Sequence, residues 1–155
     1  MAIDESTRVL VVADWTVEAT AVVAEGRRRA EGDRAVFVLM VPAWLHGLDW
    51  AGDPRAAVPC AQRQLATLAG LCLDAGLAVE VAGVGDPNLI SAIGDALADH
   101  TATSVLLCTR GRHVPAHPLD LAHRAHRATG LPVHRVTVRA GQATAHCLAD
   151  EPLAA

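Results

Sequence analysis

The sequence predicts an α/β protein in which a five-stranded parallel sheet is covered by helices on both faces. Five short apolar runs alternate with longer stretches whose apolar residues recur at helical spacing. The runs are continuously apolar, which is typical of strands buried on both faces. Right-handed crossovers through the helices then make the sheet parallel. A chain of 155 residues suffices for one core, so we expect a single domain over 1–155, with its core in 8–139 and a C-terminal extension in 140–155.

The strands are predicted from β-branched and apolar runs that end at turn residues. The first run, R-V-L-V-V-A, stops at Asp14-Trp15-Thr16, and the second, A-V-F-V-L-M-V, is closed by Pro42. The five expected strands are Arg8–Ala13, Ala35–Val41, Leu77–Gly83, Val105–Cys108 and Pro132–Val138.

The helices are predicted from apolar periodicity and from start and stop signals. Thr16 is the expected cap of the first helix, whose last turn carries three arginines at the negative end of the helix dipole. Asn88 or Asp86 is expected to cap the third, while Gly76 and Gly130 are stop signals after the second and fourth. The four expected helices are Val17–Arg29, Arg55–Ala75, Leu89–Ala98 and Pro118–Thr129.

Composition excludes several classes of function. The formal net charge of −4 gives no reason to expect a nucleic-acid partner. All 13 basic residues are arginine, so a P-loop lysine or a Schiff-base lysine is excluded. There is no apolar run of about 20 residues and no basic-then-apolar start, so we expect no membrane partner and a cytoplasmic protein.

The reactive side chains favour neither a metal site nor a catalytic one. The four cysteines contain no C-x-x-C pair, and we expect them to be buried thiols. His123 and His126 lie three apart on a predicted helix, a spacing that zinc can use, but no carboxylate or cysteine matches it, so an exposed helix face is favoured. Cys108 is the best nucleophile candidate, and its apolar neighbours are expected to raise its pKa and leave it inert.

Two irregular segments remain open to interpretation. The long loop from Ala43 to Pro54 holds two tryptophans, which either cover the edge of the core or form part of a lid. After Cys108 the chain reads T-R-G-R-H, at the carboxyl end of a strand where open α/β sheets bind ligands. Arg110, Arg112 and His113 can hold a phosphate there or form a solvated rim.

Four local features together resemble the universal stress protein family, over about Arg8 to Arg139. The first strand ends in Asp14-Trp15-Thr16, where the family has Asp-x-Ser, and the second ends in Val41-Pro42 before a variable loop. Gly85-Asp86-Pro87 precedes a helix with I-x-x-A spacing, similar to the family's Gly-x-Pro segment. Finally, L-L-C-T-R-G-R runs through a helix into L-P-V-H-R-V, much as the family's M-G-T-R-G-R runs into C-P-V-L-V-V.

The resemblance implies a doubly wound, Rossmann-like sheet of the adenine nucleotide alpha hydrolase-like type, with strand order 3-2-1-4-5. It also implies a nucleotide site at the carboxyl edge of that sheet. The residues that would form this site are Asp14, Trp15, Thr16, Val41, Cys108, Thr109, Arg110, Gly111, Arg112 and Asp120.

The phosphate half of that site departs from the family's pattern, which reads G-x-x-G, about nine residues, then G-[S/T]. Cys108 stands at the first glycine and only Gly111 matches the second. No glycine occupies the closing position near Leu119–Ala122, where Asp120 would repel a phosphate instead. We therefore expect no cofactor bound by the family's usual route, with ATP or AMP as the candidate ligands if one binds.

Three functions follow as hypotheses. The first is a non-enzymatic regulatory or interaction module with a degenerate nucleotide site, dimerising through the fifth strand at Val133, Arg135 and Thr137, as the family's strand does. The second is a nucleotide-binding stress sensor that uses Asp14, Val41 and the loop after Cys108. The third is a weak nucleotide hydrolase, which lacks an apparent general base near the loop.

Overall fold

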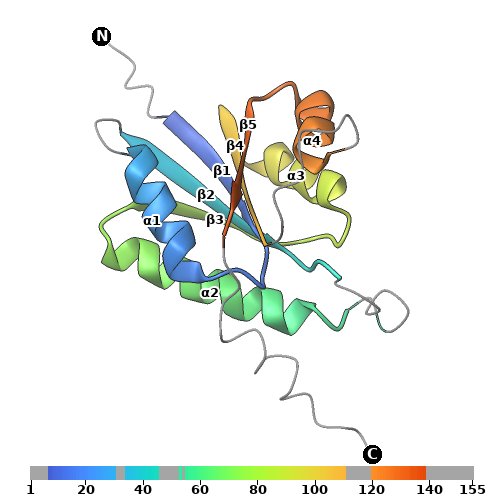
Figure 1. Ribbon diagram of the computed structural model, residues 1–155, viewed down its shortest axis with the longest axis horizontal. Helices are drawn as coiled ribbons and strands as arrows, with labels where there is room; N and C mark the ends of the chain where they lie inside the picture. Colours follow the sequence, from blue (N-terminus) through green and yellow to red (C-terminus); the bar gives the residue numbers. More distant parts are fainter. Residues whose placement is uncertain (1–6, 31–33, 46–52, 54, 111–119, 139–155) are drawn as a thin grey trace, which may run out of the picture.

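The computed structural model describes residues 7–30, 34–45, 53, 55–110 and 120–138. These residues form alternating strands and helices (Figure 1). In chain order the elements are β1 (Thr7–Ala13), α1 (Ala19–Ala30), β2 (Ala35–Pro42), α2 (Val58–Asp74), β3 (Ala78–Gly85), α3 (Leu89–Asp99), β4 (Ser104–Thr109), α4 (Leu121–Thr129) and β5 (Val133–Thr137).

The strands form one parallel sheet in the order β3-β2-β1-β4-β5, as predicted. The chain starts at the central strand β1 and adds β2 and β3 on one side of it. It then crosses back and adds β4 and β5 on the other side, so the direction of winding reverses at β1. β1 pairs Val9 with Phe37 on one side and with Ser104 on the other. The carboxyl ends of β1 and β4 therefore lie side by side, which is where a doubly wound sheet opens a crevice.

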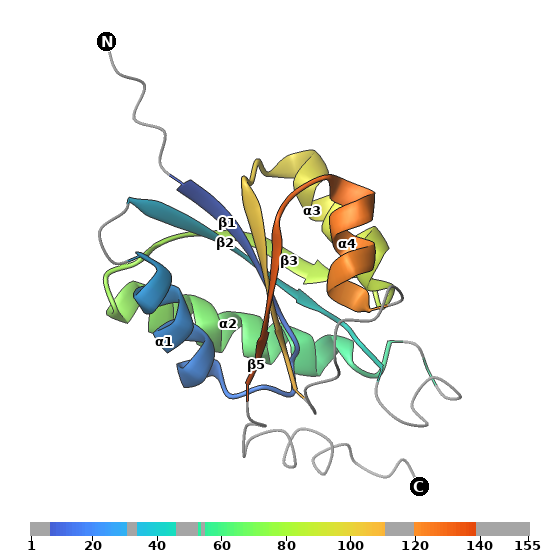
Figure 2. The same ribbon diagram turned by 45° about the horizontal axis from the view of Figure 1, so that its top comes forward.

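Two hydrophobic clusters fill the two faces of the sheet. One lies under α1 and α2 and includes Phe37 and Leu68, and the other lies under α3 and α4 and includes Leu107 and Ile93. Figures 1 and 2 show α1 and α2 on one face and α3 and α4 on the other. The continuous apolar runs of the central strands are explained by this arrangement, because both faces of β1 and β4 are covered.

The structure corrects the predicted start of the first helix. α1 begins at Ala19 rather than Val17, and Thr16 does not cap it. The backbone N–H of Thr16 instead donates to Asp14 Oδ1 at 3.2 Å, and Thr16 is only 1% exposed. The turn after β1 therefore uses Asp14 as its side-chain acceptor before the helix starts.

The other predicted boundaries that the structure describes agree with the observed ones to within three residues. Asn88 caps α3 as expected, its Oδ1 accepting from Ser91 N at 3.2 Å. Gly76 and Gly130 follow α2 and α4 with φ of +75° and +71°, the left-handed conformation expected of helix stop residues. The described part of α4 begins at Leu121, after Asp120. The expected start at Pro118 and the tail Gly141–Ala155 lie outside the described residues.

The cysteines only partly follow the prediction. Cys72 and Cys108 are buried free thiols. Cys60 is disulfide-bonded, so the expectation of a thiol is wrong at that position. Cys147 lies outside the described residues.

No helix among the described residues is long and apolar enough to cross a membrane.

Candidate functional site

Asp14 joins the carboxyl ends of β1 and β4. Its backbone N–H donates to the carbonyl oxygen of Cys108 at 3.0 Å, which extends the pairing of the two strands by one step. Its side chain accepts from Thr16 N, and its own carbonyl accepts from Val17 N at 3.3 Å. Asp14 is 3% exposed. The Asp14 carboxylate, which the family resemblance assigns to the nucleotide site, thus shapes the turn after β1.

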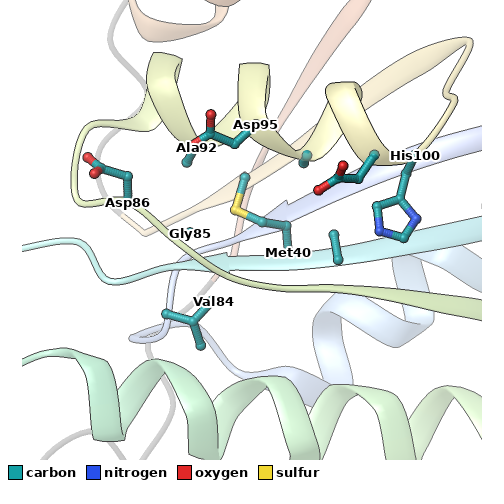
Figure 3. A pocket seen from close by; sticks show the side chains of 10 residues that line it. Met40, Val84, Gly85, Asp86, Ala92, Asp95 and His100 are labelled. Atoms are coloured by element: carbon teal, nitrogen blue, oxygen red, sulfur yellow. The ribbon is translucent and has the colours of Figure 1, made fainter.

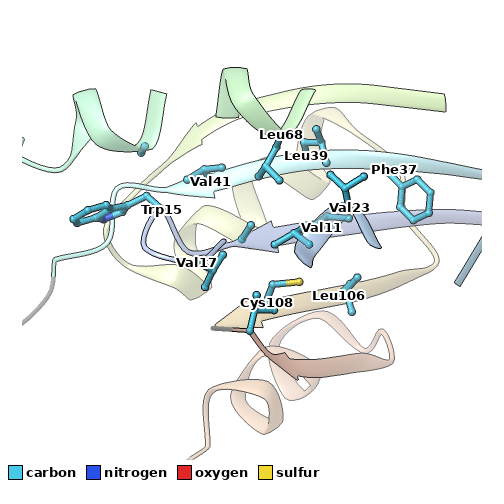
Figure 4. Close-up of a cluster of buried hydrophobic side chains, with 14 of the residues drawn as sticks. Val11, Trp15, Val17, Val23, Phe37, Leu39, Val41, Leu68, Leu106 and Cys108 are labelled. Carbon is cyan, nitrogen blue, oxygen red and sulfur yellow. The ribbon is translucent and has the colours of Figure 1, made fainter. Parts of the chain in front are cut away.

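Trp15 closes the gap between the ends of β1 and β2. Its indole Nε1–H donates to the carbonyl oxygen of Trp44, just beyond β2, at 2.7 Å. The side chain is 5% exposed and belongs to the same cluster as the fully buried Val41, at one end of that cluster (Figure 4). Four of the predicted site residues, Asp14, Trp15, Thr16 and Val41, are therefore buried at this edge of the sheet.

Gln64, on α2, binds the backbone of this turn, a role that was not predicted from the sequence. Its amide Nε2 donates to the carbonyl oxygen of Val17 at 2.8 Å and lies 3.5 Å from that of Asp14. Gln64 lies on the buried stripe of α2, between Ala61 and Leu68. A glutamine on an otherwise apolar helix stripe is the signal that marks it, because a buried amide requires hydrogen-bond partners.

Cys108 faces the core rather than the loop that follows β4. The residue is fully buried in the cluster under α1 and α2, with Val11 and Leu106 (Figure 4). Burial raises the pKa of its thiol to about 12. Because the thiolate is the reactive form, this shift disfavours reactivity at neutral pH, in the direction that the apolar neighbours predict.

Arg135 brings Thr109 and Asp120 together, although the sequence analysis assigned it to a dimer contact. From β5 its Nε donates to Thr109 Oγ1 at 3.3 Å, and its Nη1 donates to Asp120 Oδ1 at 2.7 Å. Asp120 stands at the N-cap position of α4 but makes no capping hydrogen bond. The Asp120 charge is thus paired within the site. The register places Thr137 opposite Thr109, and Arg135 two residues earlier on the same face.

The remaining loop residues are only partly described. Arg110 follows β4 and is exposed. Gly111, Arg112 and His113 lie outside the described residues, so their assignment to a phosphate site stays a prediction.

The histidines of α4 form no metal centre with other described residues. His126 Nδ1 lies 2.7 Å from the carbonyl oxygen of Leu131, which closes the turn after the helix. Among the described side chains, no group of three or more histidine, cysteine or acidic residues is placed to hold a metal ion.

The comparisons with known proteins bear on the fold. No family model matches the chain, and no curated protein matches it. Among solved structures, the chain is similar to the crystal structure of a protein from the universal stress protein family from Burkholderia pseudomallei. The two superpose with a TM-score of 0.55 at 17% identity, over 89% of this chain and 100% of that one.

This chain has a universal stress protein fold. The strand order expected from the sequence resemblance is confirmed, and so is the likeness to that family at the level of fold. On the universal stress protein fold, Asp14, Val41 and Thr109 lie at the carboxyl ends of β1, β2 and β4. The candidate site is therefore the carboxyl edge of the sheet, where Trp15 bonds to Trp44 beyond β2 and Arg135 pairs with Asp120 beside β4.

Proposed function

We propose that this chain is a universal-stress-protein-like regulatory or interaction module without enzymatic activity, cytoplasmic and homodimeric, whose nucleotide site is degenerate. The observation that supports this most directly is the burial of Trp15, with its hydrogen bond to Trp44. A nucleotide base at this edge would have to contact Asp14 and Val41. Both are covered by the protein's own side chains, at 3% and 0% exposure.

The phosphate side supports the same proposal. A phosphate cradle needs backbone N–H groups that a ligand can approach closely, and glycines allow that approach. Here the first glycine position is held by Cys108, whose side chain packs into the core. Arg135, a residue able to bind phosphate, is already paired with Asp120. A ligand would have to break that ion pair before it could use the guanidinium.

The test is a titration with ATP, ADP and AMP, each with and without Mg²⁺, followed by tryptophan fluorescence and thermal shift. We expect no saturable response up to millimolar nucleotide. The Asp14→Ala variant should respond as the wild type does, with Asp74→Ala on α2 as the control for loss of a carboxylate. A micromolar response that Asp14→Ala abolishes would replace this proposal with the nucleotide sensor, and ATP turnover would replace it with the hydrolase.

The dimer is proposed to form through the outer edge of β5. Val105 N donates to the carbonyl oxygen of Pro132, and Val138 N donates to that of Thr109, each at 2.9 Å. Because backbone groups alternate in direction along a strand, those of Val133, Arg135 and Thr137 point away from β4. An edge strand with free backbone groups is a template for pairing with another strand.

A proline at this edge tests the dimer without altering the ladder between β4 and β5. Thr137→Pro removes an outward N–H and should halve the mass measured by sedimentation at high salt. Thr137→Val keeps the N–H and is the matched control. A dimer that survives Thr137→Pro with unchanged affinity would exclude pairing through β5.

A further inference from the structure

A ridge of small side chains runs along the exposed side of α3. Ser91, Gly94 and Ala98 are exposed, and their spacing of three and four residues places them on one ridge. A Cβ added at Gly94 would meet no atom within 4 Å. Glycine inside a helix costs up to about 1 kcal/mol relative to alanine, and no packing contact in the described chain accounts for it here. Another helix could approach this ridge closely, because interaxial distance depends on side-chain size.

One flank of this ridge is basic. A shallow groove of about 550 Å³ separates α3 from α4 and is lined by Ile90, Ser91, Arg124, Arg127 and Ala128, together with Asn88. Both arginines are exposed. Neither forms an ion pair with any residue that the structure describes. The two positive charges are therefore available to a partner.

The other flank is acidic. A hollow of about 110 Å³ lies between α3 and the edge strand β3, and Asp86, Asp95 and Asp99 are among its lining residues. Figure 3 shows Asp86 before α3 and Asp95 on the helix above Met40. Asp95 and Asp99 are exposed and make no ion pair within the described part of the chain.

These two flanks are complementary to each other under a two-fold rotation. Turning a second copy by 180° about an axis along α3, in the plane of this face, places its acidic flank over the basic flank of the first. The same rotation places its basic flank over the first copy's acidic flank, as an isologous interface requires. The small ridge lies on the axis, where the two α3 helices would meet.

We propose that this surface, called the α3 face, is a docking site for a second copy of this chain. It comprises Ser91, Gly94 and Ala98, flanked by Asp95 and Asp99 on one side and by Arg124 and Arg127 on the other. Two sets of opposite charges then meet across the interface, and the helices pack through small residues. The α3 face is separate from the outer edge of β5, so its existence does not depend on the dimer proposed above.

Charge reversal tests the pairing. Asp95→Arg with Asp99→Arg makes the face wholly basic, and Arg124→Asp with Arg127→Asp makes it wholly acidic. Each double variant should repel itself and have a lower mass than the wild type when both are measured by sedimentation at low salt. An equimolar mixture of the two should recover the wild-type mass, because each copy then meets the opposite charge. Recovery in the mixture shows that neither variant has misfolded.

A steric variant tests the helix contact independently of charge. Gly94→Gln improves helix propensity, so the protein should remain folded, but its side chain occupies the ridge. We expect it to raise the concentration for half-association at least about tenfold. The control variants are on α2. Gly70→Gln is the control for Gly94→Gln, and Arg63→Asp with Asp74→Arg is the control for the charge reversals. The proposal is overturned if either charge variant keeps the wild-type mass, if the mixture does not recover it, or if Gly94→Gln associates like Gly70→Gln.

Discussion

Arg8, Glu80 and His100 meet at the amino end of the sheet, far from the candidate site. The Arg8 guanidinium donates to Glu80 Oε2 at 2.5 Å and to the carbonyl oxygen of Thr101 at 2.8 Å. His100 Nδ1 lies 3.2 Å from the same Glu80 oxygen. The hydrogen bond from Arg8 is the main cause that lowers the pKa of Glu80 to about 2. This cluster links β1, β3 and the segment between α3 and β4.

Glu80→Gln should therefore destabilise the protein in a pH-dependent way. The folded-state pKa lies below the unfolded value of about 4.3, so ionised Glu80 stabilises the fold above that value. This contribution is lost as pH falls toward 2. Urea unfolding should show the variant less stable than the wild type at pH 7 and nearly equal to it at pH 2. For Asp74→Asn, an exposed change on α2, the difference in stability from the wild type should not shrink between pH 7 and pH 2. If the difference in stability between Glu80→Gln and the wild type does not vary with pH, the ion-pair explanation is contradicted.

Gly85 is required by close approach rather than by backbone conformation. A Cβ there would lie 2.6 Å from Met40 Sδ and 2.8 Å from Ala92 Cβ, so Met40 of β2 and Ala92 of α3 pack directly against this last residue of β3. Gly85→Ala should lower the free energy of unfolding by about 1–3 kcal/mol through overpacking. Gly70→Ala in α2 has no atom within 4 Å of the new Cβ and should stabilise by about 0.5–1 kcal/mol. Chemical denaturation of both variants measures the contrast, and equal effects would contradict it.

At the scale of elements, Gln64 fixes α2 to the connection between β1 and α1. Gln64→Leu keeps the apolar packing but leaves the buried carbonyl of Val17 without its 2.8 Å donor. The expected loss is about 1–3 kcal/mol of unfolding free energy. Gln62→Leu, the same change at an exposed position of α2, should have little effect. Amide hydrogen exchange should also be faster around Val17 in Gln64→Leu but not in Gln62→Leu. Equal protection of these amides in both variants would show that the Gln64 hydrogen bond does not hold α2 to this connection.

The elements themselves could be predicted from the sequence because their signals are local. A continuously apolar run such as β4 and a stop glycine such as Gly130 each encode their own conformation. The start of α1 could not, because Thr16 is a good N-cap residue in isolation. Its N–H is instead taken by Asp14, and the chain buries Thr16 before the helix begins at Ala19.

The candidate site was harder to predict than the fold. Asp14, Trp15 and Val41 could be assigned to one edge from the sequence because they lie at strand ends, and parallel strands end at one edge. Their burial was not predicted, because it depends on Gln64 and Trp44, which come from other elements. The pairing of Arg135 with Asp120 was missed for the same reason, since it depends on the register of β5. Contacts between distant segments require the assembled sheet.

At the scale of the whole molecule, the two proposed self-association surfaces respond differently to salt. Pairing through β5 uses backbone hydrogen bonds, whereas docking through the α3 face uses exposed charges. Exposed charges are screened over about 30 Å at 0.01 M salt and about 3 Å at 1 M. Two isologous interfaces on one chain build assemblies larger than a dimer. We therefore expect the mass to fall with increasing salt, and to stop falling at the dimer.

Sedimentation of the wild type and Thr137→Pro at 0.01 M and 1 M NaCl tests both surfaces together. The wild type should exceed a dimer at low salt and be a dimer at high salt, while Thr137→Pro should change from dimer to monomer. A wild-type mass that is the same at both salt concentrations would exclude docking through the α3 face. A wild type that becomes monomeric at 1 M NaCl would exclude the β5 dimer but remain consistent with docking through the α3 face. Because each failure has its own pattern, the four masses decide which surface, if either, this protein uses to assemble.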